Sequence, residues 1–409
     1  MRILFVAHYF QPEPNFFFGL PFAKELVKRG HEVEVLTGFP NYPGGKVYDG
    51  YRVQLLQKET LEGIRILRVP LYPSHDKSSL RRTIGYTSFA LSASIMGPAL
   101  VKSADVAYIC QGPATLGLPG GVLRLLRGIP FVYNIQDLWP DTLLSTGMLN
   151  SPTGLKLVDL WCTWVYRWAS RIVVITPGFK QTLCQRGVPE DKIQVIYNWC
   201  DESQLHPADT DPALAGKLGL TGRFNIVYAG NMGTAQALGA VLEAARMVEA
   251  THPRVQFVLI GGGVEVGPLR QRAADMGLTN VRFVERQPTS QIAKILRLAD
   301  VLLVHLKDDP LFRITIPSKT QAYMAVGRPI LIGVKGDAAD LVTQARAGLV
   351  CEPENPHSIA QAVQRFQEMS PAELDAMGDN GKKFYERELS IGAGTSRYEK
   401  VFRAVAKKS

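Results

Sequence analysis

Paired cysteines are missing from this sequence. Its five cysteines are spread over 409 residues, and no two of them form a Cys-x-x-Cys motif. This spacing argues against a disulfide framework and against a zinc site, and it is typical of proteins in a reducing compartment. The residues concerned are Cys110, Cys162, Cys184, Cys200 and Cys351.

A long apolar run is missing as well. No stretch approaches the ~20 uninterrupted apolar residues of a membrane span, and the N-terminal run Ile3–Ala7 is too short for a signal peptide. We therefore expect a cytoplasmic protein. The net charge of +9 suits anionic partners such as nucleotide phosphates or anionic lipid. The basic residues are dispersed and form no known nucleic-acid-binding motif, so we expect no nucleic acid partner.

The loop after the first predicted strand lacks the glycines of a dinucleotide-binding turn. Strand Ile3–Ala7 is followed by His8–Asn15, and the first glycine comes only at Gly19. A nicotinamide or flavin cofactor would need glycines here, so that its pyrophosphate can approach the backbone. The strand end carries His8 instead, which either faces a ligand or is a structural histidine.

Two series of alternating strands and helices are present. Short apolar runs such as Phe131–Asn134 alternate with helical segments, and the pattern restarts at Phe224–Ala229 after the polar stretch Asp201–Pro212. Such alternation is typical of doubly wound parallel sheets. We predict a first domain over residues 1–200, a second over 201–383, and a C-terminal helix over 384–409 that returns to the first domain.

The segment Ile316–Ile330 is the most informative part of the second half. It is typical of a proline loop, a short helix that begins at Ser318-Lys319, and a turn into an apolar strand. A helix N-terminus offers backbone N–H groups and the positive end of its dipole, so it binds anions. Ser318 adds a cap oxygen and Lys319 a positive charge. This pattern predicts a diphosphate site, and an ordinary capped helix with a solvated lysine is the alternative.

Small and polar residues follow other strands of the second half. Ligands of open α/β sheets bind beyond the carboxyl ends of the strands, so these loops are expected to converge on one edge. Glycines there let a ligand approach the backbone, although any sharp turn uses them too. The segments are Gly230–Gly233, Gly261–Gly263, Phe283–Arg286 and His305–Asp309.

In the first half, Asp137 follows the strand that ends near Asn134. A carboxylate at a strand end can hydrogen-bond sugar hydroxyls or act as a general base. The spacing equally allows Asp137 to cap the following helix. The loop Pro40–Gly45 follows the second strand, and by itself it is only a turn-rich loop.

Taken together, these landmarks resemble the retaining GT-B glycosyltransferases of family 4, the group 1 transferases. The similarity covers essentially the whole length, and it is greatest to bacterial L-fucosaminyltransferases of O-antigen and capsule assembly. It implies an α/β protein with two doubly wound Rossmann-like domains facing across a central cleft. The landmarks are His8–Asn15, Arg29–Val33, Pro40–Pro43, Asp137–Pro140, Tyr228–Gly233, Ile260–Gly263, Ala299–Val301 and Pro317–Pro329.

The resemblance implies a nucleotide-sugar donor, usually a UDP-sugar and here one similar to UDP-N-acetyl-fucosamine. A glycan or polyprenyl-diphosphate-linked acceptor would face the first domain. Transfer would keep the anomeric configuration, without a metal or another cofactor, in the synthesis of O-antigen, capsule or exopolysaccharide.

The resemblance also assigns roles to residues. The donor-binding set is Gly230, Asn231, Gly233, Gly262, Val284, Arg286, Lys307, Ser318, Lys319 and Gln321. The acceptor-side set is Glu13, Asn15, Asn41 and Tyr42. The catalytic set is Asp137, His8, Lys319 and Arg313.

The sequence departs from the family in two respects. The family's usual arginine and lysine after the first strand of the second domain are absent, and Asn231 and Gln236 stand in that region. Most members carry a pair of glutamates where this chain has Ile314 and Ala322, so we expect Gln321 to contact the ribose instead. Negative charge on the leaving diphosphate must still be stabilised, and Lys319, Arg313 and Lys307 are the candidates. Two alternatives are a nucleotide-sugar epimerase of the same architecture and a non-catalytic nucleotide-sugar-binding protein.

Two segments, Leu80–Lys102 and Leu155–Arg171, combine basic residues with apolar and aromatic ones. Helices of this kind lie in membrane interfaces. We therefore expect peripheral contact with an anionic membrane at its inner face. The alternative is that both helices face the protein core.

Overall fold

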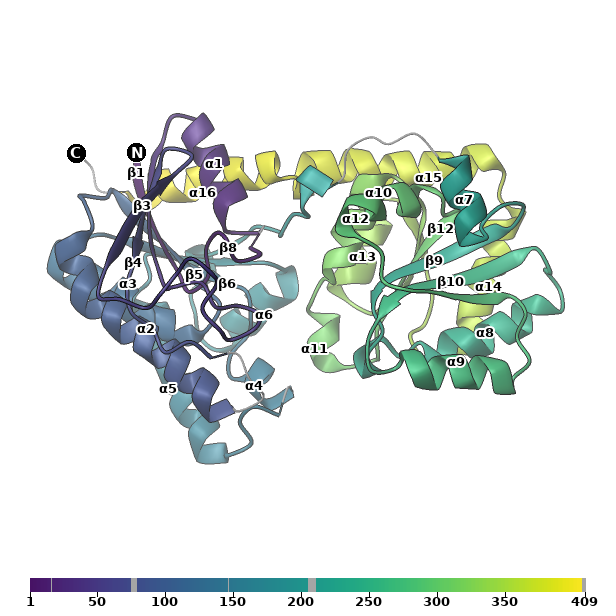
Figure 1. Cartoon of the computed structure of the whole chain (residues 1–409), viewed down its shortest axis with the longest axis horizontal. Helices are drawn as coiled ribbons and strands as arrows, with labels where there is room; N and C mark the ends of the chain where they lie inside the picture. The colour runs from purple at the N-terminus through teal and green to yellow at the C-terminus, as the bar shows by residue number, and fades with distance from the viewer. Residues whose placement is uncertain (16, 75–78, 146, 205–210, 407–409) are drawn as a thin grey trace. The chain divides into compact units, whose positions relative to one another are not determined.

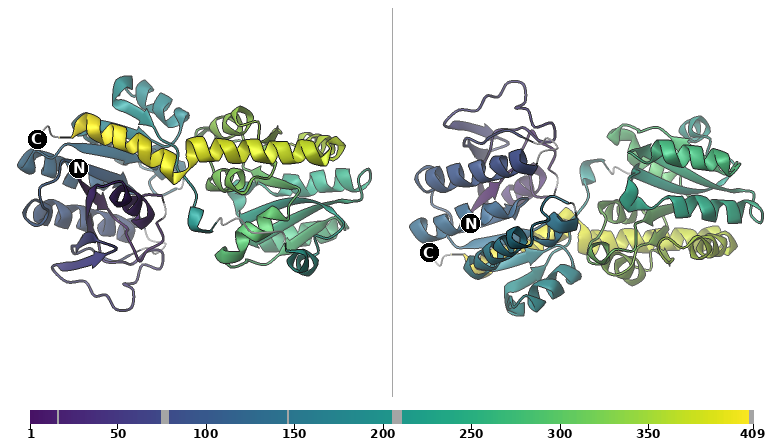
Figure 2. Two further views of the ribbon diagram at one scale, coloured as in Figure 1. Left: turned by 90° about the horizontal axis from the view of Figure 1, so that it is seen from above. Right: turned by 90° about the horizontal axis from the view of Figure 1, so that it is seen from below.

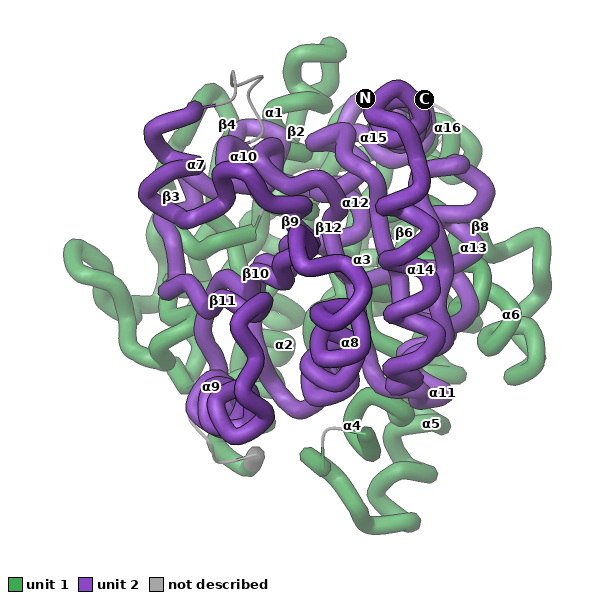
Figure 3. Tube along the Cα trace, turned by 90° about the vertical axis from the view of Figure 1, so that its right-hand side faces the viewer, with its two compact units in different colours: residues 1–197, 394–409 green, residues 198–393 purple. Residues whose placement is uncertain are grey.

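The computed structural model describes residues 1–15, 17–74, 79–145, 147–204 and 211–406. The chain divides into two compact units (Figure 3). Unit 1 comprises Met1–Tyr197 and Gly394–Ser409, and unit 2 comprises Asn198–Ala393. Both units are Rossmann-like, with helices around a mainly parallel sheet, so the predicted fold class of two α/β Rossmann-like domains is confirmed.

Unit 1 contains an eight-stranded sheet in the order β3-β4-β2-β1-β5-β6-β7-β8. Its pairs are parallel except β3 and β4, which form a hairpin through Glu62-Gly63. Strand β5 is buried along its whole length, as expected where helices cover both faces of a parallel sheet. The strands are β1 (Arg2–Ala7), β2 (Glu32–Thr37), β3 (Gln57–Leu61), β4 (Ile64–Arg68), β5 (Val106–Gln111), β6 (Phe131–Ile135), β7 (Arg171–Val174) and β8 (Ile193–Val195).

Three helices cover one face of this sheet: α2 (Ser79–Leu100), α3 (Gly117–Arg127) and α5 (Pro152–Trp168). They share a face because the crossovers β4–β5, β5–β6 and β6–β7 are right-handed and run in the same direction across the sheet. Helix α3 packs against both α2 and α5 (Figures 1 and 2). Unit 1 also contains α4 (Asp141–Ser145), α6 (Pro177–Gln185) and the 3₁₀ turns η1 (Ala114–Leu116) and η2 (Glu190–Lys192).

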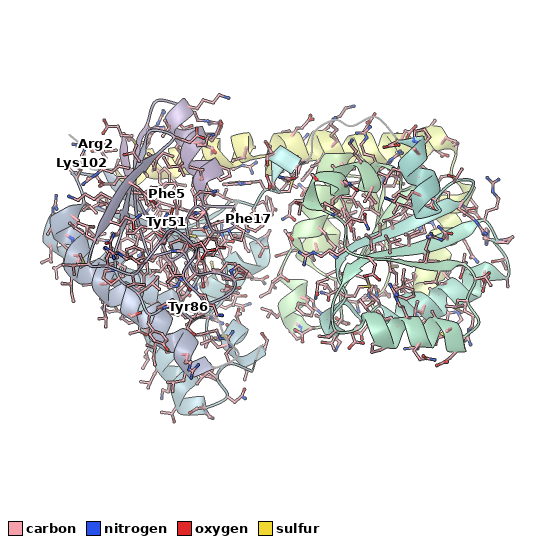
Figure 4. The ribbon with its side chains drawn as sticks, in the orientation of Figure 1. Arg2, Phe5, Phe17, Tyr51, Tyr86 and Lys102 are labelled. Carbon is pink, nitrogen blue, oxygen red and sulfur yellow. The ribbon has the colours of Figure 1, made fainter. Side chains whose placement is uncertain are left out.

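The opposite face carries α1 (Leu20–Lys28) and the C-terminal helix α16 (Ile391–Val405). The ring of Phe22 on α1 lies 4.9 Å from that of Tyr398 on α16, and Tyr398 lies 5.4 Å from Tyr108 on β5. Phe5 of β1 packs against Phe22 in the interior of the unit (Figure 4). The residues of α16 from Gly394 onward therefore complete the core of unit 1.

Unit 2 contains a six-stranded parallel sheet in the order β11-β10-β9-β12-β13-β14. Its strands are β9 (Phe224–Asn231), β10 (Val255–Gly262), β11 (Val281–Val284), β12 (Val301–His305), β13 (Ile330–Gly333) and β14 (Gly348–Val350). Its helices are η3 (Glu202–Gln204), α7 (Pro212–Leu218), η4 (Thr234–Gln236), α8 (Gly239–Glu249), α9 (Val266–Asp275), α10 (Thr289–Arg297), α11 (Pro310–Arg313), α12 (Ser318–Val326), α13 (Asp337–Gln344), α14 (Pro356–Glu368), α15 (Pro371–Phe384) and the π-helical turn η5 (Tyr385–Leu389).

The register of β9 and β10 sets the geometry of one edge of this sheet. Gly230 pairs with Gly261, and Asn231 pairs with Gly262. The two glycine loops predicted from the sequence therefore leave the sheet side by side.

All five cysteines are free thiols. Among the described helices, none combines the length and the apolar composition of a membrane span.

Candidate functional site

Helix α12 begins beside the glycine loops of unit 2. Pro317 is its N-cap residue, and no side chain caps the first turn. The cap expected from Ser318 is therefore not formed, because Ser318 is already the first helical residue and is exposed. The first N–H groups of a helix have no intrahelical acceptor, so this end of α12 can donate hydrogen bonds to an anion.

Lys319 lies on the first turn of α12 and points back to the end of β9. Its side chain is half-buried as a whole, but its Nζ is buried and makes no hydrogen bond within the described residues. Nζ lies 3.6 Å from the ring centroid of Tyr228, a cation–π contact. Burial lowers the pKa of Lys319 from 10.5 to about 7, because an ammonium without a counterion is poorly solvated there.

Glycines make room for this lysine. Gly230 has φ +142°, and a Cβ atom on it would lie 3.3 Å from Nζ of Lys319. Gly261, at φ +140°, has no room for a side chain, since its Cβ would lie 2.0 Å from the carbonyl oxygen of Gly230. Residues other than glycine rarely adopt such positive φ values, so the site requires glycine at both positions.

A pocket of 590 Å³ opens in front of Lys319. Its size suits a nucleotide-sized ligand. The walls come from the ends of β9 and β10, from the loop after β11, and from α10 and α12. The lining residues are Ala229, Gly230, Asn231, Ile260, Gly261, Gly262, Gly263, Arg286, Gln287, Thr289, Ile292, Leu296, Lys319, Ala322 and Tyr323.

Five predicted donor-binding residues share this pocket, namely Gly230, Asn231, Gly262, Arg286 and Lys319. Ala322, which stands where the family carries a glutamate, lines it as well. No carboxylate is among the lining side chains in the described part of the chain.

Other predicted donor-binding residues lie elsewhere. Gly233 and Lys307 line a second pocket of 510 Å³ at the same end of the sheet. Val284 ends β11 and does not line the first pocket. The side chain of Gln321 is buried, and its amide is oriented to donate to the carbonyl oxygens of Pro317 (2.9 Å) and Ser318 (3.2 Å). The amide is thus engaged by the helix's own first turn. Arg313, which was predicted as a catalytic residue, is exposed and pairs with Asp308 at 2.8 Å.

Sequence reasoning missed two tyrosines and the apolar wall of this pocket. The hydroxyl of Tyr323 donates to the carbonyl of Ala229 (3.2 Å) and accepts from its N–H (3.0 Å), which ties α12 to the end of β9. Tyr228 supplies the ring beneath Lys319. In the sequence both look like ordinary core aromatics. Ile292 and Leu296 of α10 look like the inner face of any amphipathic helix.

In unit 1, Asp137 follows β6, and Gln111 holds its backbone. The amide of Gln111 donates to the carbonyl of Asp137 at 3.0 Å. Helix α4 begins only at Asp141, so Asp137 does not cap it. Asp137 as a whole residue is exposed, yet the surrounding protein partly desolvates its carboxyl group and so raises its pKa. A raised pKa suits a group that exchanges protons, although structural carboxylates show it too.

His8 lies at the end of β1 in an aromatic cluster. Its ring is buried and makes edge contacts with Tyr9, Tyr86 and Phe89 at centroid distances of 4.5 to 5.3 Å. Figure 4 shows Tyr86 on α2. The aromatic packing fixes the orientation of the His8 ring.

Glu13 holds two loops of unit 1 together. Its carboxylate is buried and accepts hydrogen bonds from the backbone N–H groups of Phe10 (3.1 Å), Asn41 (2.8 Å) and Tyr42 (2.8 Å). Burial raises the pKa of Glu13, while these bonds lower it. Asn15 is a loop residue whose side-chain amide donates to the carbonyl of Tyr9. Among the predicted acceptor-side residues, Glu13 therefore holds the loops in place, and Tyr42 packs against Tyr9 with tilted rings whose centroids are 4.6 Å apart.

The geometry defines a class of protein. Two Rossmann-like units, one of which carries a nucleotide-sized pocket beside a helix N-terminus at the carboxyl edge of its sheet, are the components of a GT-B protein.

Comparison with known sequences gives the family. Residues 20–199 match the glycosyl transferase 4-like domain, and residues 213–384 match the glycosyl transferases group 1 family. The chain is a glycosyltransferase of GT-B fold. The putative colanic acid biosynthesis glycosyl transferase WcaI of Escherichia coli is 28% identical over 351 residues, covering 83% of this chain and 85% of the relative. The probable glycosyltransferase WbjE of Pseudomonas aeruginosa is 24% identical, covering 74% of this chain and 76% of the relative.

Solved structures share the fold. Anabaena HepE in complex with UDP has a TM-score of 0.67 at 15% identity, with 99% of this chain and 100% of that chain covered. Sucrose-phosphate synthase from Thermosynechococcus elongatus has a TM-score of 0.69 at 16% identity, with 98% of each chain covered.

Proposed function

We propose that this glycosyltransferase transfers a sugar from a UDP-sugar to a glycan or lipid-linked acceptor with retention of configuration. The proposed setting is the synthesis of a bacterial surface polysaccharide, such as an exopolysaccharide or O-antigen. The relative WcaI is named for colanic acid biosynthesis, and the fold neighbour HepE has been solved with UDP, UDP-glucose and glucose. The name of WcaI supports the setting of polysaccharide synthesis, and the ligands of HepE support a UDP-sugar as the donor.

The observation that carries the proposal is the buried ammonium of Lys319. An ammonium without a partner is unfavourable in a folded protein unless a ligand supplies the counter-charge. A diphosphate bound between Gly230 and the first turn of α12 would supply it. The same contact would stabilise the charge that develops on the leaving diphosphate, so it would act in the transition state as well as in the ground state.

The remaining walls of the pocket suit the rest of a nucleotide. Ile260, Ile292 and Leu296 form an apolar surface on which a base ring can lie, and Arg286 borders it. The loop Gly261–Gly263 allows close approach of the ribose and phosphates to the backbone. Ala322 leaves space where the family's glutamate would contact the ribose, so sugar-ring contacts are expected to differ from those of the wider family.

The proposed mechanism relies on positioning and electrostatics. The pocket offers cationic and backbone donors but no carboxylate nucleophile among the described lining residues. The acceptor hydroxyl would attack the anomeric carbon on the face that the diphosphate leaves, which retains configuration. Asp137, with its raised pKa, is the proposed proton acceptor in unit 1. No metal is assigned a role.

The sugar is proposed to be of the N-acetyl-fucosamine type, by resemblance to L-fucosaminyltransferases. A screen of UDP-sugars, each with polyprenyl-diphosphate-linked acceptors and analysed for the anomeric configuration of the product, tests this assignment and retention together.

The experiment that tests the donor class is thermal unfolding with UDP, GDP, ADP and NAD at matched concentrations. A ligand at about 100 times its Kd adds ~2.7 kcal/mol of stability, which gives a readable shift in Tm. We expect a shift with UDP. A shift with NAD alone would overturn the proposal. Turnover of the donor to a free epimerised sugar without acceptor would identify an epimerase instead, and UDP binding without turnover on any acceptor would indicate a binding protein.

A further inference from the structure

The outer faces of α2, α3 and α5 are unusually apolar. Fourteen large apolar side chains are exposed in the described part of the chain, and eight of them lie on these three helices. Unit 2 contributes only Val264 and Val350 to the fourteen, and neither lies on a helix. The eight are Leu80, Ile84, Leu91 and Ile95 on α2, Leu125 and Leu126 on α3, and Leu157 and Leu160 on α5, with exposed fractions between 45% and 77%.

Helix α2 shows the exposed apolar face most clearly. Its inner side carries Phe89 and Ala93, which are fully buried. Its outer side carries Leu91 and Ile95, which are 48% and 77% exposed. A helix on the surface of a soluble protein normally has a polar outer face, whereas α2 is apolar on both sides. Such a patch marks a binding surface.

Helix α5 adds an aromatic ladder to this surface. Trp161 and Trp164 stack with ring centroids 5.0 Å apart, and Trp164 lies 5.0 Å from Trp168. All three are half-buried: Nε1 of Trp161 donates to the carbonyl of Ala114 at 3.0 Å, and Trp164 lies over Gly121 of α3, where an added Cβ would be 3.0 Å away. The rings therefore also pack against the protein, at the edge of the exposed apolar face. Tryptophan is enriched where one side of a ring is apolar and the other meets water or lipid headgroups.

The charge of the three helices identifies the partner. They carry six basic residues and one acidic residue. The basic residues are Arg81, Arg82, Arg124, Arg127, Lys156 and Arg167, and the acidic residue is Asp159. Arg124 and Lys192 donate to carbonyl oxygens at the C-terminus of α5, so positive charge gathers at that end of the helix layer.

We propose that the outer face of α2, α3 and α5 binds an anionic lipid bilayer. The exposed leucine and isoleucine side chains would enter the interfacial region, while arginine and lysine heads would remain at the level of the phosphates. A protein partner of acidic character would need matching pockets for each apolar side chain. A bilayer needs only a broad apolar face with positive charge around it, and this surface has both.

Two double variants test separately how apolar side chains and positive charges contribute to bilayer binding. Leu91→Ser/Ile95→Ser removes apolar side chains that are 48% and 77% exposed. Its matched control is Val350→Ser/Leu55→Ser, which removes side chains that are 45% and 74% exposed away from the three helices. Lys156→Gln/Arg167→Gln removes two charges on α5, and Lys294→Gln/Lys383→Gln is its control in unit 2. All four variants alter exposed positions, so folding is expected to survive.

The measurement is co-sedimentation of the full chain with vesicles of phosphatidylcholine, alone or mixed with phosphatidylglycerol. The wild type is expected to sediment with the anionic vesicles and to be released by salt. Loss of two interfacial charges should weaken partitioning by about 25-fold, at roughly fivefold per charge. Loss of two apolar side chains should weaken it by roughly 10- to 100-fold. Both controls should match the wild type.

Three results would overturn the proposal. The first is no sedimentation of the wild type with either vesicle. The second is an equal loss of binding in a variant and in its control. The third is a self-associated wild type that Leu91→Ser/Ile95→Ser converts to monomer without any vesicle binding, which would assign the face to a second copy of the chain. The assay contains no donor or acceptor, so its failure leaves the proposed transfer reaction untouched.

Discussion

The substitution Lys319→Met replaces a buried ammonium by an apolar side chain of similar length. The pKa of Lys319 falls from 10.5 to about 7 on folding, because burial disfavours the charged form. One pKa unit corresponds to about 1.4 kcal/mol. Since the side chain as a whole is half-buried, we expect the ammonium to reduce the stability of unit 2 by about 2–4 kcal/mol at pH 7. Lys319→Met should therefore unfold at a higher temperature than the wild type.

The direction in which stability changes with pH follows from the difference in proton binding between the unfolded and the folded protein. Between pH 7 and pH 10.5 the unfolded wild type keeps the proton on Lys319 while the folded state releases it. The wild type therefore gains stability relative to Lys319→Met as the pH rises, by up to about 1.4 kcal/mol per pH unit. The advantage of the variant should be largest at pH 7 and below, and should vanish near pH 10.5.

Calorimetric unfolding of the two proteins at several pH values, with and without UDP, measures both effects. Lys307→Met is the control, because Lys307 is exposed on the loop after β12 and its removal should change stability by less than about 0.5 kcal/mol. Lys319→Met should also bind UDP about 10- to 100-fold more weakly and transfer sugar about 10²–10³-fold more slowly. A variant no more stable than the wild type at pH 7, or one with wild-type transfer, would refute the reasoning.

Three further predictions concern the same contacts and the core of unit 1. Gly230→Ala should weaken UDP binding at least tenfold, measured by calorimetric titration, because the methyl group would lie 3.3 Å from Nζ of Lys319 at a strained φ of +142°; unchanged affinity would show that the diphosphate does not pass there. The affinity for UDP should be constant below pH 7 and fall by up to about tenfold per pH unit above it, with proton uptake on binding, because the ammonium of Lys319 titrates at about 7; a flat profile to pH 9 would exclude this role. Glu399→Gln should destabilise unit 1 by about 1–2 kcal/mol in urea denaturation at pH 7. Although burial raises the pKa of Glu399, hydrogen bonds from His31 and an arginine hold it below its usual value, so this difference should be lost as the pH falls below the ordinary glutamate pKa, and a difference that persists at pH 3 would contradict the assignment.

Much of the fold could be predicted because the sheets are parallel. Strands such as Ile3–Ala7 and Phe257–Ile260 are buried on both faces and therefore read as continuous apolar runs. The edge hairpin β3–β4 was not predicted as such, since β3 is only half-buried and its residues alternate weakly. An edge strand has a single neighbour, so its sequence is less constrained.

The candidate site was predicted in part. Gly230 and Gly262 were recognised from loops that follow strands, and Lys319 from a predicted helix start. The pairing of β9 with β10 brings the two glycine loops together, and Lys319 lines the same pocket. Ser318 and Gln321 belong to the same helix turn as Lys319, but neither lines the pocket. The amide of Gln321 donates instead to carbonyl oxygens of the first turn of α12. Spacing along a chain does not fix the rotation of a short helix about its axis.

The sequence by itself determined the two-unit α/β architecture, the edge of the second sheet where the pocket opens, and the presence of a lysine at a helix start there. These depend on local apolar periodicity and on glycine and proline, which act within a few residues. Only the tertiary structure decided that Nζ of Lys319 is buried over Tyr228, that Tyr323 ties α12 to β9, and that the neighbouring helices α2, α3 and α5 leave apolar side chains exposed. Burial, and the pKa shift that it causes, depend on atoms brought together from distant parts of the chain, and no local pattern records them.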